Sequence, residues 1–477
     1  MDKKNKVLLF VLISAFIFRI IIAYTSPILW WDEAVYANLG HDLTKNPLDY
    51  SFENNGWSDF VPDGQWPKAG FRPPLLPLIL AIFYFLKINS LIFLIIPLIG
   101  TLSVFFTYLL GKKLFGERVG LYSAIFLALS PLHVIHSSKI LTGVLSTFLG
   151  LLTFFIFWKG YEEKNNKFKV LFGLFFALAV LTRYNMIWFL PIFLLYFIVR
   201  NKSFKFLFDK YLWYSILAFF IVLTPWMIYG FLEYNNFLGP FIHASNAASF
   251  WGGVSPGNFL FYEGWDIFSI SGIIFILALL YITYKKEFKR KEIYFLLIWI
   301  AIFLWLFMFM SHKEDRHLLP IFPPLMIICG FFVKKIKKFR KPILILLIIF
   351  MLIILSKGIY LDYKKAHTGT IACFLEANNF LKSVEKNSAI ITDESPSVYY
   401  YTKKETYFYP NPWSLDKLAI IKNNHFQGKN IYIFFTDYDM PLHDKEHIKI
   451  KKDLDDNFEK VFTCDKNWGL SAIYKYD

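Results

Sequence analysis

The chain has 477 residues, of which 56% are hydrophobic and 20% aromatic, and its mean hydropathy is +0.44. Apolar runs of about 20 residues, the length that crosses a hydrocarbon core, recur through residues 1–357 and exclude a soluble globular protein. In a soluble protein a net charge of +15 would indicate nucleic-acid binding. Here most basic residues lie in short loops between apolar runs. We therefore expect a membrane protein, with membrane lipids and not nucleic acid as its surroundings.

The N-terminal segment predicts an uncleaved membrane helix. Its start, MDKKNK, is basic, and the apolar run from Val7 to about Leu29 contains no small-residue cleavage site. The basic flank places the N-terminus in the cytoplasm. Residues 30–73 then form a long, polar, tryptophan-rich first outer loop.

Two apolar stretches follow this loop, Pro73–Leu86 and Leu91–Leu110, before the basic segment GKKLFGER. If both stretches crossed the membrane, the basic segment would lie outside, against the positive-inside rule. The first stretch is shorter and opens with two prolines. Residues 74–86 are therefore expected to form a helix in the outer interface and not a crossing.

With that choice every later basic loop is cytoplasmic, and the length rule gives about eleven transmembrane helices in a multi-span domain of residues 1–357. The predicted fold class is an α-helical polytopic membrane protein with an extracytoplasmic C-terminal domain. The basic residues of the cytoplasmic loops lie within 112–118, 159–169, 200–205, 285–291 and 334–341.

Residues 358–477 differ in character, because they contain no run long enough to span a membrane. Short apolar segments such as SAIIT, NIYIFFTD and SAIYKY alternate with helix-like patterns such as CFLEANNFLKSV and LDDNFEKV. We expect a small α/β domain on the outer side of the plasma membrane. Cys373 and Cys464 lie in this domain and are able to pair in an oxidising compartment, although their spacing does not demand it, and Cys329 lies in a span.

Two charged clusters lie beside apolar segments on the predicted outer side. A charge there costs free energy unless it is hydrated, paired with an opposite charge or part of a functional site. The first is WWDEAVY, in which Asp32 and Glu33 follow two tryptophans that can anchor in the interface. A carboxylate there can accept the proton of an attacking hydroxyl. The alternative is that Asp32 only caps the helix that begins EAVYANLG.

Basic residues close the first outer loop and recur in the second cluster, SHKEDRHLLP. A guanidinium at this depth can hold a lipid phosphate in a bidentate pair, whereas the simpler alternative is snorkelling to headgroups. Snorkelling explains one or two such residues, but not five in one turn. The five-residue spacing of the two histidines does not favour a metal site. The candidates are Lys68, Arg72, His312, Lys313, Glu314, Arg316 and His317.

Further polar residues interrupt apolar segments at the same predicted depth. His136 and Lys139 lie three residues apart, so a helix would place them on one side. Their recurrence at the level of the clusters suggests a shared substrate cavity. The alternative for Arg183 is a residue that ends one helix and is hydrated by the outer water. This group comprises His133, His136, Lys139, Arg183 and Tyr184.

The order of these motifs resembles the GT-C class of integral membrane glycosyltransferases. WWDEAVY and KAGFRPPLLPLIL resemble the protein O-mannosyltransferase and aminoarabinose transferase superfamily, and HKEDRHLLP resembles a turn of the lipid-linked mannosyltransferases. The resemblance covers about residues 1–357. It implies inverting transfer of a sugar from a polyprenyl-phosphate donor to a hydroxyl of a lipid, glycan or protein acceptor on the outer face.

The resemblance also implies residue roles. Asp32, with Glu33 beside it, would act as the base or position the acceptor, and Arg72 and Arg316 would hold the donor phosphate. Many relatives carry an acidic residue where this chain reads Thr142 and Gly143. If that acid helps to bind a divalent metal in the relatives, a metal is not expected here, and the sequence indicates no certain cofactor.

Two other classes of function remain open. A secondary transporter or flippase for a lipid-linked or anionic substrate should carry its charges near the membrane midplane, whereas these charges cluster at one face. A receptor or assembly module anchored by the spans would not need so many crossings.

Overall fold

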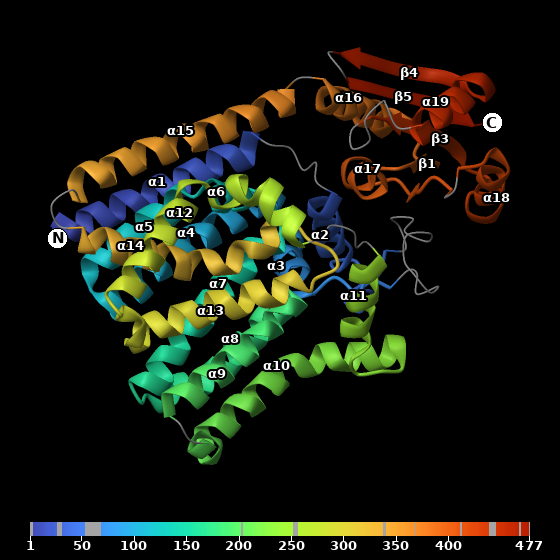
Figure 1. Cartoon of the computed structure of the whole chain (residues 1–477). Coiled ribbons are helices and arrows are strands. Elements are labelled where there is room, and N and C mark those ends of the chain that lie inside the picture. Colours follow the sequence, from blue (N-terminus) through green and yellow to red (C-terminus); the bar gives the residue numbers. More distant parts are fainter. Residues whose placement is uncertain are drawn as a thin grey trace. The chain divides into compact units, whose positions relative to one another are not determined.

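The computed structural model describes residues 3–25, 31–52, 68–201, 204–250, 256–336, 340–367, 369–410, 413–437, 445–466 and 469–476 (Figure 1). Trp30 and residues 53–67 of the predicted outer loop lie outside these ranges. The chain divides into two compact units. The first contains Met1–Tyr24, Gly70–Leu76 and Ser90–Ile359, and the second contains Thr25–Ala69, Pro77–Asn89 and Tyr360–Asp477. The predicted limits 1–357 and 358–477 stay a prediction.

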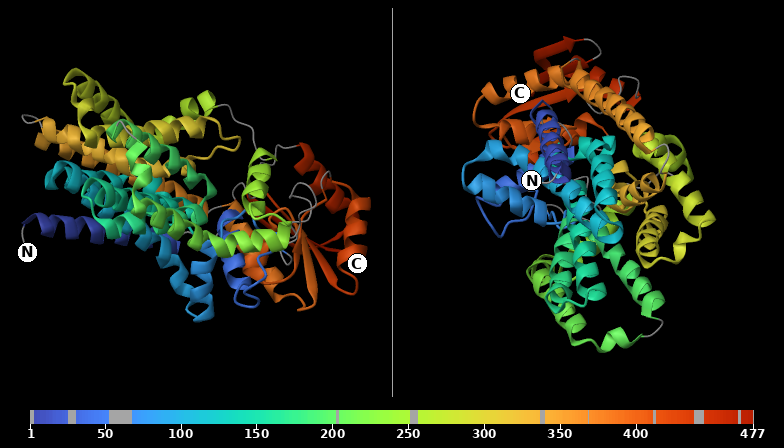
Figure 2. Two further views of the ribbon diagram at one scale, coloured as in Figure 1. Left: turned by 90° about the horizontal axis from the view of Figure 1, so that it is seen from below. Right: turned by 90° about the vertical axis from the view of Figure 1, so that its left-hand side faces the viewer.

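Helices are the only regular secondary structure in the described residues of the first unit, and the long ones run alongside one another in the left view of Figure 2. Its elements are α1 (Lys3–Thr25), α4 (Ile92–Phe115), α5 (Glu117–Leu129), α6 (Pro131–His136), α7 (Thr142–Phe157), η4 (Trp158–Glu162), α8 (Asn166–Thr182), η5 (Tyr184–Trp188), α9 (Phe189–Asn201), η6 (Phe204–Phe208), α10 (Lys210–Tyr234), α11 (Gly239–Phe250), α12 (Pro256–Tyr284), η7 (Glu287–Lys289), α13 (Lys291–Met308), η8 (Asp315–Ile321), α14 (Phe322–Lys335) and most of α15 (Arg340–His367).

Eight helical segments in the described residues are long and apolar enough to cross a membrane. This is fewer than the expected eleven, because α5, α8 and α9 have only 13, 17 and 13 residues. Helix α3 (Leu75–Phe85), within the predicted interfacial segment, has 11 residues and is about 16 Å long, roughly half a hydrocarbon core. The candidate spans are Lys4–Thr25, Asn89–Phe115, Thr142–Glu162, Lys210–Tyr234, Glu263–Tyr284, Lys291–Met308, Asp315–Lys335 and Leu344–Leu361.

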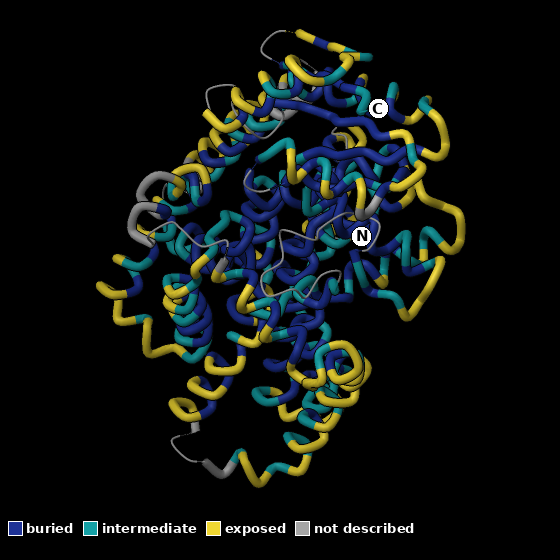
Figure 3. The backbone as a smooth tube through the Cα atoms, turned by 90° about the vertical axis from the view of Figure 1, so that its right-hand side faces the viewer, coloured by how far each residue is buried: buried dark blue, intermediate teal, exposed yellow. Residues whose placement is uncertain are grey.

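The spans differ in how deeply they are buried inside the protein. Asp315–Lys335 is 89% buried and Thr142–Glu162 is 78% buried, whereas Leu344–Leu361 is only 17% buried. The first two therefore form the centre of the bundle, whereas many large apolar residues of α15 are exposed, as on a lipid-facing helix. Figure 3 colours the backbone by the burial of each residue. Close packing depends on small residues, since a Cβ at Gly330 of α14 would lie 2.8 Å from Ser123 Oγ of α5.

The C-terminal part of the second unit is the predicted α/β domain. Its strands are β1 (Ser388–Thr392), β2 (Thr406–Tyr407), β3 (Asn430–Thr436), β4 (Glu459–Lys466) and β5 (Gly469–Tyr476), in the order β2-β1-β3-β5-β4. β1 pairs in parallel with β2 and β3, and β5 pairs antiparallel with β3 and β4. In the register, Ile390 lies opposite Tyr432 and Phe434 opposite Ile473.

Alternate side chains of these strands enter two separate cores. Ile390, Phe434 and Ile473 pack on α16 (Thr370–Ser383) and α17 (Ser395–Thr402). Residues of the opposite parity, such as Ile391 and Ile433, pack on α18 (Leu415–His425) and α19 (Lys445–Asn457). This two-residue alternation places helices on both faces of the sheet. The segment LDDNFEKV, read as helical, is helical only to Asn457, because β4 begins at Glu459 and pairs with β5.

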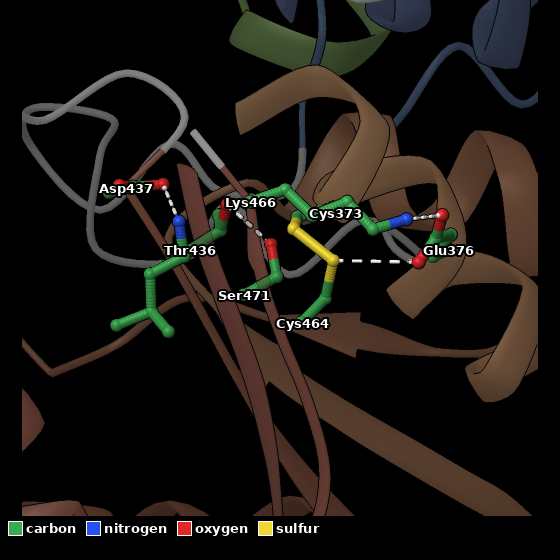
Figure 4. The surroundings of a disulfide bond; sticks show 8 residues. Cys373, Glu376, Thr436, Asp437, Cys464, Lys466 and Ser471 are labelled. Carbon is green, nitrogen blue, oxygen red and sulfur yellow. Dashed lines mark hydrogen bonds and ion pairs between the residues drawn. A yellow bond between two sulfur atoms is a disulfide. The ribbon is translucent and has the colours of Figure 1, made fainter. Parts of the chain in front are cut away.

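A disulfide joins Cys373 of α16 to Cys464 of β4, with the Cα atoms 5.3 Å apart (Figure 4). It resolves the pairing that the sequence left open. Cys329 is free and fully buried in α14, as expected for a residue in a span. The bridge fastens a helix on one face of the sheet to an edge strand.

Candidate active site

The turn that links α13 to α14 concentrates charge in the first unit. η8 begins at Asp315, directly after Glu314, and the guanidinium of Arg316 donates through Nη2 to Glu314 Oε1 at 2.6 Å. His312 Nε2 lies 2.7 Å from the same oxygen. Burial alone would raise the pKa of Glu314, but the hydrogen bond from His312 and the charge of Arg316 outweigh it and hold the pKa below its ordinary value. Glu314 is therefore a carboxylate that fixes the buried Arg316 guanidinium.

The same turn is connected to the short helix α6. His136 Nε2 donates to Asp315 Oδ2 over 3.2 Å, and the His136 side chain is buried. Gly143, at the start of α7, lies against the turn, because a Cβ there would be 3.0 Å from Leu319 Cδ1 and 3.5 Å from the carbonyl oxygen of Arg316. An acidic side chain at this position would point into η8. The structure therefore leaves little room for a larger side chain at Gly143.

A buried arginine in α1 contacts the other histidine of α6. Arg19 Nη2 lies 2.9 Å from His133 Nδ1, and Nη1 donates to the carbonyl oxygen of Ala15 at 2.9 Å. A guanidinium cannot accept a hydrogen bond, so His133 Nδ1 is the acceptor and the proton of the neutral ring is on Nε2. Arg19 therefore selects one tautomer of His133.

Tyr184 and Arg183 connect the loop before α3 to the charged turn. The Tyr184 hydroxyl donates to the carbonyl oxygen of Gly70 at 2.7 Å, and Gly70 N donates to Tyr234 Oη at 3.2 Å. These bonds fix the backbone two residues before Arg72. Arg183, adjacent to Tyr184, is near enough to the buried ring of His317 for its positive charge to act on that ring. Tyr184 is therefore a support of the Arg72 segment.

We call this connected set the polar cluster. It joins predicted residues from four separate parts of the chain, and it adds Arg19 and Asp315, which the sequence analysis missed. Arg19 was detectable as the one charged residue inside the apolar run from Val7 to Leu29, and Asp315 stands within the quoted motif. Among the remaining predicted residues, Lys139 is buried, and Lys313 Nζ donates to the carbonyl oxygen of Met310. The polar cluster comprises Arg19, His133, His136, Arg183, Tyr184, His312, Glu314, Asp315, Arg316 and His317, and the bond from Tyr184 to Gly70 links it to the segment that carries Arg72.

The acidic pair lies in the second unit. Asp32 and Glu33 occupy the first turn of α2 (Trp31–Asp42), and Glu33 is buried. The helix begins before Asp32, so Asp32 is inside the first turn and not at the cap position that the alternative interpretation required. Lys68 is in an isolated antiparallel bridge with Ser51, also in the second unit.

No group of three or more His, Cys, Asp or Glu side chains in the described ranges is arranged to hold a metal ion. His312 and His317, which were weighed as metal ligands, have ring centroids 6.1 Å apart, and His312 is occupied with Glu314. The polar cluster offers guanidinium and imidazole groups, together with the carboxylates of Glu314 and Asp315 and the phenol of Tyr184.

A helical membrane bundle with this fold is shared with solved glycosyltransferases of the GT-C class. ArnT from Cupriavidus metallidurans bound to undecaprenyl phosphate superposes with a TM-score of 0.72 over 99% of this chain and 98% of that chain, at 11% identity. The archaeal oligosaccharyltransferase AglB from Archaeoglobus fulgidus, in complex with an inhibitory peptide and a dolichol-phosphate, superposes with a TM-score of 0.61. The match covers 91% of this chain and 69% of that chain, at 12% identity.

These likenesses and the sequence motifs define a multi-pass membrane glycosyltransferase of the GT-C class, which confirms the resemblance stated from the sequence. Residues 65–414 match the Alg9-like mannosyltransferase family, and the chain belongs to that family. An uncharacterised protein of Aquifex aeolicus is 25% identical over 274 residues, and the match covers 56% of this chain and 54% of that protein. The chain thus spans about half the length of the curated relative it matches.

Proposed function

We propose that the protein transfers a hexosyl or pentosyl group from a polyprenyl-phosphate donor to an acceptor hydroxyl on the outer face of the membrane, with inversion at the anomeric carbon. The observation that carries this proposal is the buried Arg316 guanidinium, set by Glu314 at the beginning of a central span. Arg183 interacts with the adjacent His317 and adds positive charge. Such a site suits a lipid phosphate.

The reaction assigns a task to each group. The acceptor hydroxyl loses its proton to the Asp32 carboxylate, with Glu33 beside it, as the acceptor oxygen attacks the anomeric carbon. The bond from that carbon to the phosphate oxygen breaks on the opposite face, so one displacement inverts the configuration. The leaving lipid phosphate gains charge, which Arg316 and Arg72 stabilise, with Lys68 and Lys313 as further candidates.

The solved relatives support a lipid-linked donor. The ArnT structure contains undecaprenyl phosphate, and the AglB structure contains a dolichol-phosphate together with an inhibitory peptide. The shared fold makes the same class of lipid a reasonable donor here, and it leaves a lipid, glycan or protein acceptor open. A phosphate leaving group needs charge neutralisation and no general acid, which matches a polar cluster rich in arginine and histidine.

Purified protein in detergent should release polyprenyl phosphate when given a short-chain polyprenyl-phosphate sugar and an acceptor extract from the native membrane. Mass spectrometry would identify the released lipid and the glycosylated product. The Arg316→Ala variant is the control, because it should lose release without losing the helical bundle. Movement of intact donor across a vesicle membrane without sugar transfer would instead support the flippase alternative.

The outer placement of the C-terminal domain is a proposal supported by two features. Its disulfide favours an oxidising compartment, and the basic loops of the spans favour a cytoplasmic N-terminus. A membrane-impermeant maleimide should label the Gln427→Cys variant in intact cells. The Lys167→Cys variant, also exposed, should react only after permeabilisation. Labelling of Lys167→Cys in intact cells would contradict this orientation.

A further inference from the structure

We propose that the C-terminal domain holds the acidic helix α2 at a fixed rotation and position, and that Asn38 and Tyr399 are positioning residues for Asp32 and Glu33. This inference rests on the proposed function. It concerns contacts within the second unit alone, and it gives the α/β domain a role in the reaction.

Three residues of α2 that contact this domain share one face. Trp31, Asn38 and Asp42 are seven and four residues apart, and at about 100° per residue they form one stripe along the helix. Trp31 stacks on Phe408, with ring centroids 5.2 Å apart. Asp32 and Glu33 are displaced from this stripe by about 100° and 200°. The contacts therefore fix the helix while leaving the acidic pair on other faces.

The polar contacts on the stripe are made with α17. Asn38 is fully buried, and its Nδ2 donates to the carbonyl oxygen of Pro396 at 2.9 Å. Lys403 Nζ donates to Asn38 Oδ1 at 3.4 Å, so both ends of the amide are used. The Tyr399 hydroxyl donates to Asp42 Oδ1 at 3.1 Å. A buried amide that lost these partners would be left unsatisfied, so the arrangement strongly favours one position of α2.

The opposite side of α2 is blocked by α3. A Cβ at Gly40 would lie 2.7 Å from Leu80 Cβ and 3.1 Å from the carbonyl oxygen of Pro77. Ala34 and Ala37 are also fully buried. The helix is therefore packed between α3 and α17 and has little freedom to slide or rotate.

The domain behind α17 is itself rigidly built. Val398 of α17 packs in the same core as Phe374 of α16, and the Ser395 hydroxyl donates to Thr406 Oγ1 of β2 at 2.8 Å. The disulfide joins α16 to β4. A misplacement of about 1 Å at a reacting group costs on the order of a hundredfold in rate, so small shifts of α2 would be visible in turnover.

The test compares two substitutions on this interface with a matched control. Tyr399→Phe removes only the hydroxyl that reaches Asp42, and Asn38→Leu removes the buried amide. Tyr474→Phe removes a similar tyrosine-to-carboxylate bond, to Asp455 at 2.7 Å, on the face of the sheet opposite to α17. We expect kcat to fall about tenfold or more in the first two variants, with an unchanged KM for a short-chain polyprenyl-phosphate sugar. The control should keep its kcat.

Hydrogen exchange of the α2 amides provides a readout that does not depend on the reaction. Exchange over residues 33–42 should accelerate about tenfold in Tyr399→Phe and stay unchanged in Tyr474→Phe. Equal loss of kcat in both tyrosine variants, or unchanged exchange in Tyr399→Phe, would overturn the positioning role. If exchange accelerates as expected but Asp32→Asn has normal turnover, the assignment of Asp32 fails while the clamping of α2 by α17 stands.

Discussion

Replacing Asp32 with asparagine is expected to lower turnover by at least about a hundredfold, the usual scale for a general base, while folding and donor binding stay nearly unchanged. The amide has nearly the same size and lacks the basic oxygen. Asp32 lies in the first turn of α2, where a carboxylate gains only about 0.3 to 1 kcal/mol from the helix dipole. Loss of that interaction is too small to unfold the helix.

The measurement is steady-state transfer by the purified variant, together with donor affinity and thermal stability. Asp49→Asn is the matched control, because Asp49 lies in the same outer loop and outside α2. The control should turn over normally. Near-normal turnover in Asp32→Asn would return Asp32 to a structural role at the start of the helix.

The spans were predictable because hydropathy is a local property. The runs around α1, α4 and α15 are continuous in sequence, and the two prolines and short length of the segment at 74–86 identified α3 as a helix that cannot cross. The count of crossings was less accurate. Helix α8 stops at Thr182, where the chain enters η5 through Arg183, and no hydropathy window resolves such a break.

The candidate site was predictable only as a set of polar interruptions. His136 and Arg316 stood out because each breaks an apolar segment, but their partners depend on packing between distant helices. The bond from His136 to Asp315 joins residues 179 positions apart, and the contact of Arg19 with His133 joins residues 114 apart. The role of Tyr184 as an anchor for Gly70 has no local sequence signal either.

The C-terminal domain was recognised from its alternating strands, but its relation to the first outer loop was not. Asn38 and Asp42 read as ordinary polar residues of a helix until the contacts with Pro396 and Tyr399 appear. These partners are more than 350 residues away along the chain. Contacts of such long range are set by the whole fold and cannot be read from periodicity.

Arg72 and Arg316 are expected to act on one phosphate, and their replacement should therefore be non-additive. Each charge-assisted contact contributes about 1.5 to 3 kcal/mol, so Arg72→Ala and Arg316→Ala should each weaken binding of a short-chain polyprenyl phosphate by roughly 10-fold to 150-fold. The binding free energy that the double variant loses should differ from the sum of the two single losses, because residues that share one ligand are energetically coupled. A lysine at either position should restore binding only in part, since it lacks the planar fork.

The loss of the ion pair between Arg316 and Glu314 must be separated from the loss of phosphate binding. Arg316→Ala also removes the guanidinium from Glu314, which keeps His312 as a neighbour within the described turn, and a buried carboxylate that has lost its cation would itself repel a phosphate. The double variant Glu314→Gln and Arg316→Ala removes that charge and should recover stability without recovering affinity. Arg200→Ala, which breaks a more exposed contact to Glu162 at 3.4 Å, should leave affinity unchanged. Strict additivity of Arg72→Ala and Arg316→Ala, or wild-type affinity in Arg316→Ala, would separate the late turn from the donor site.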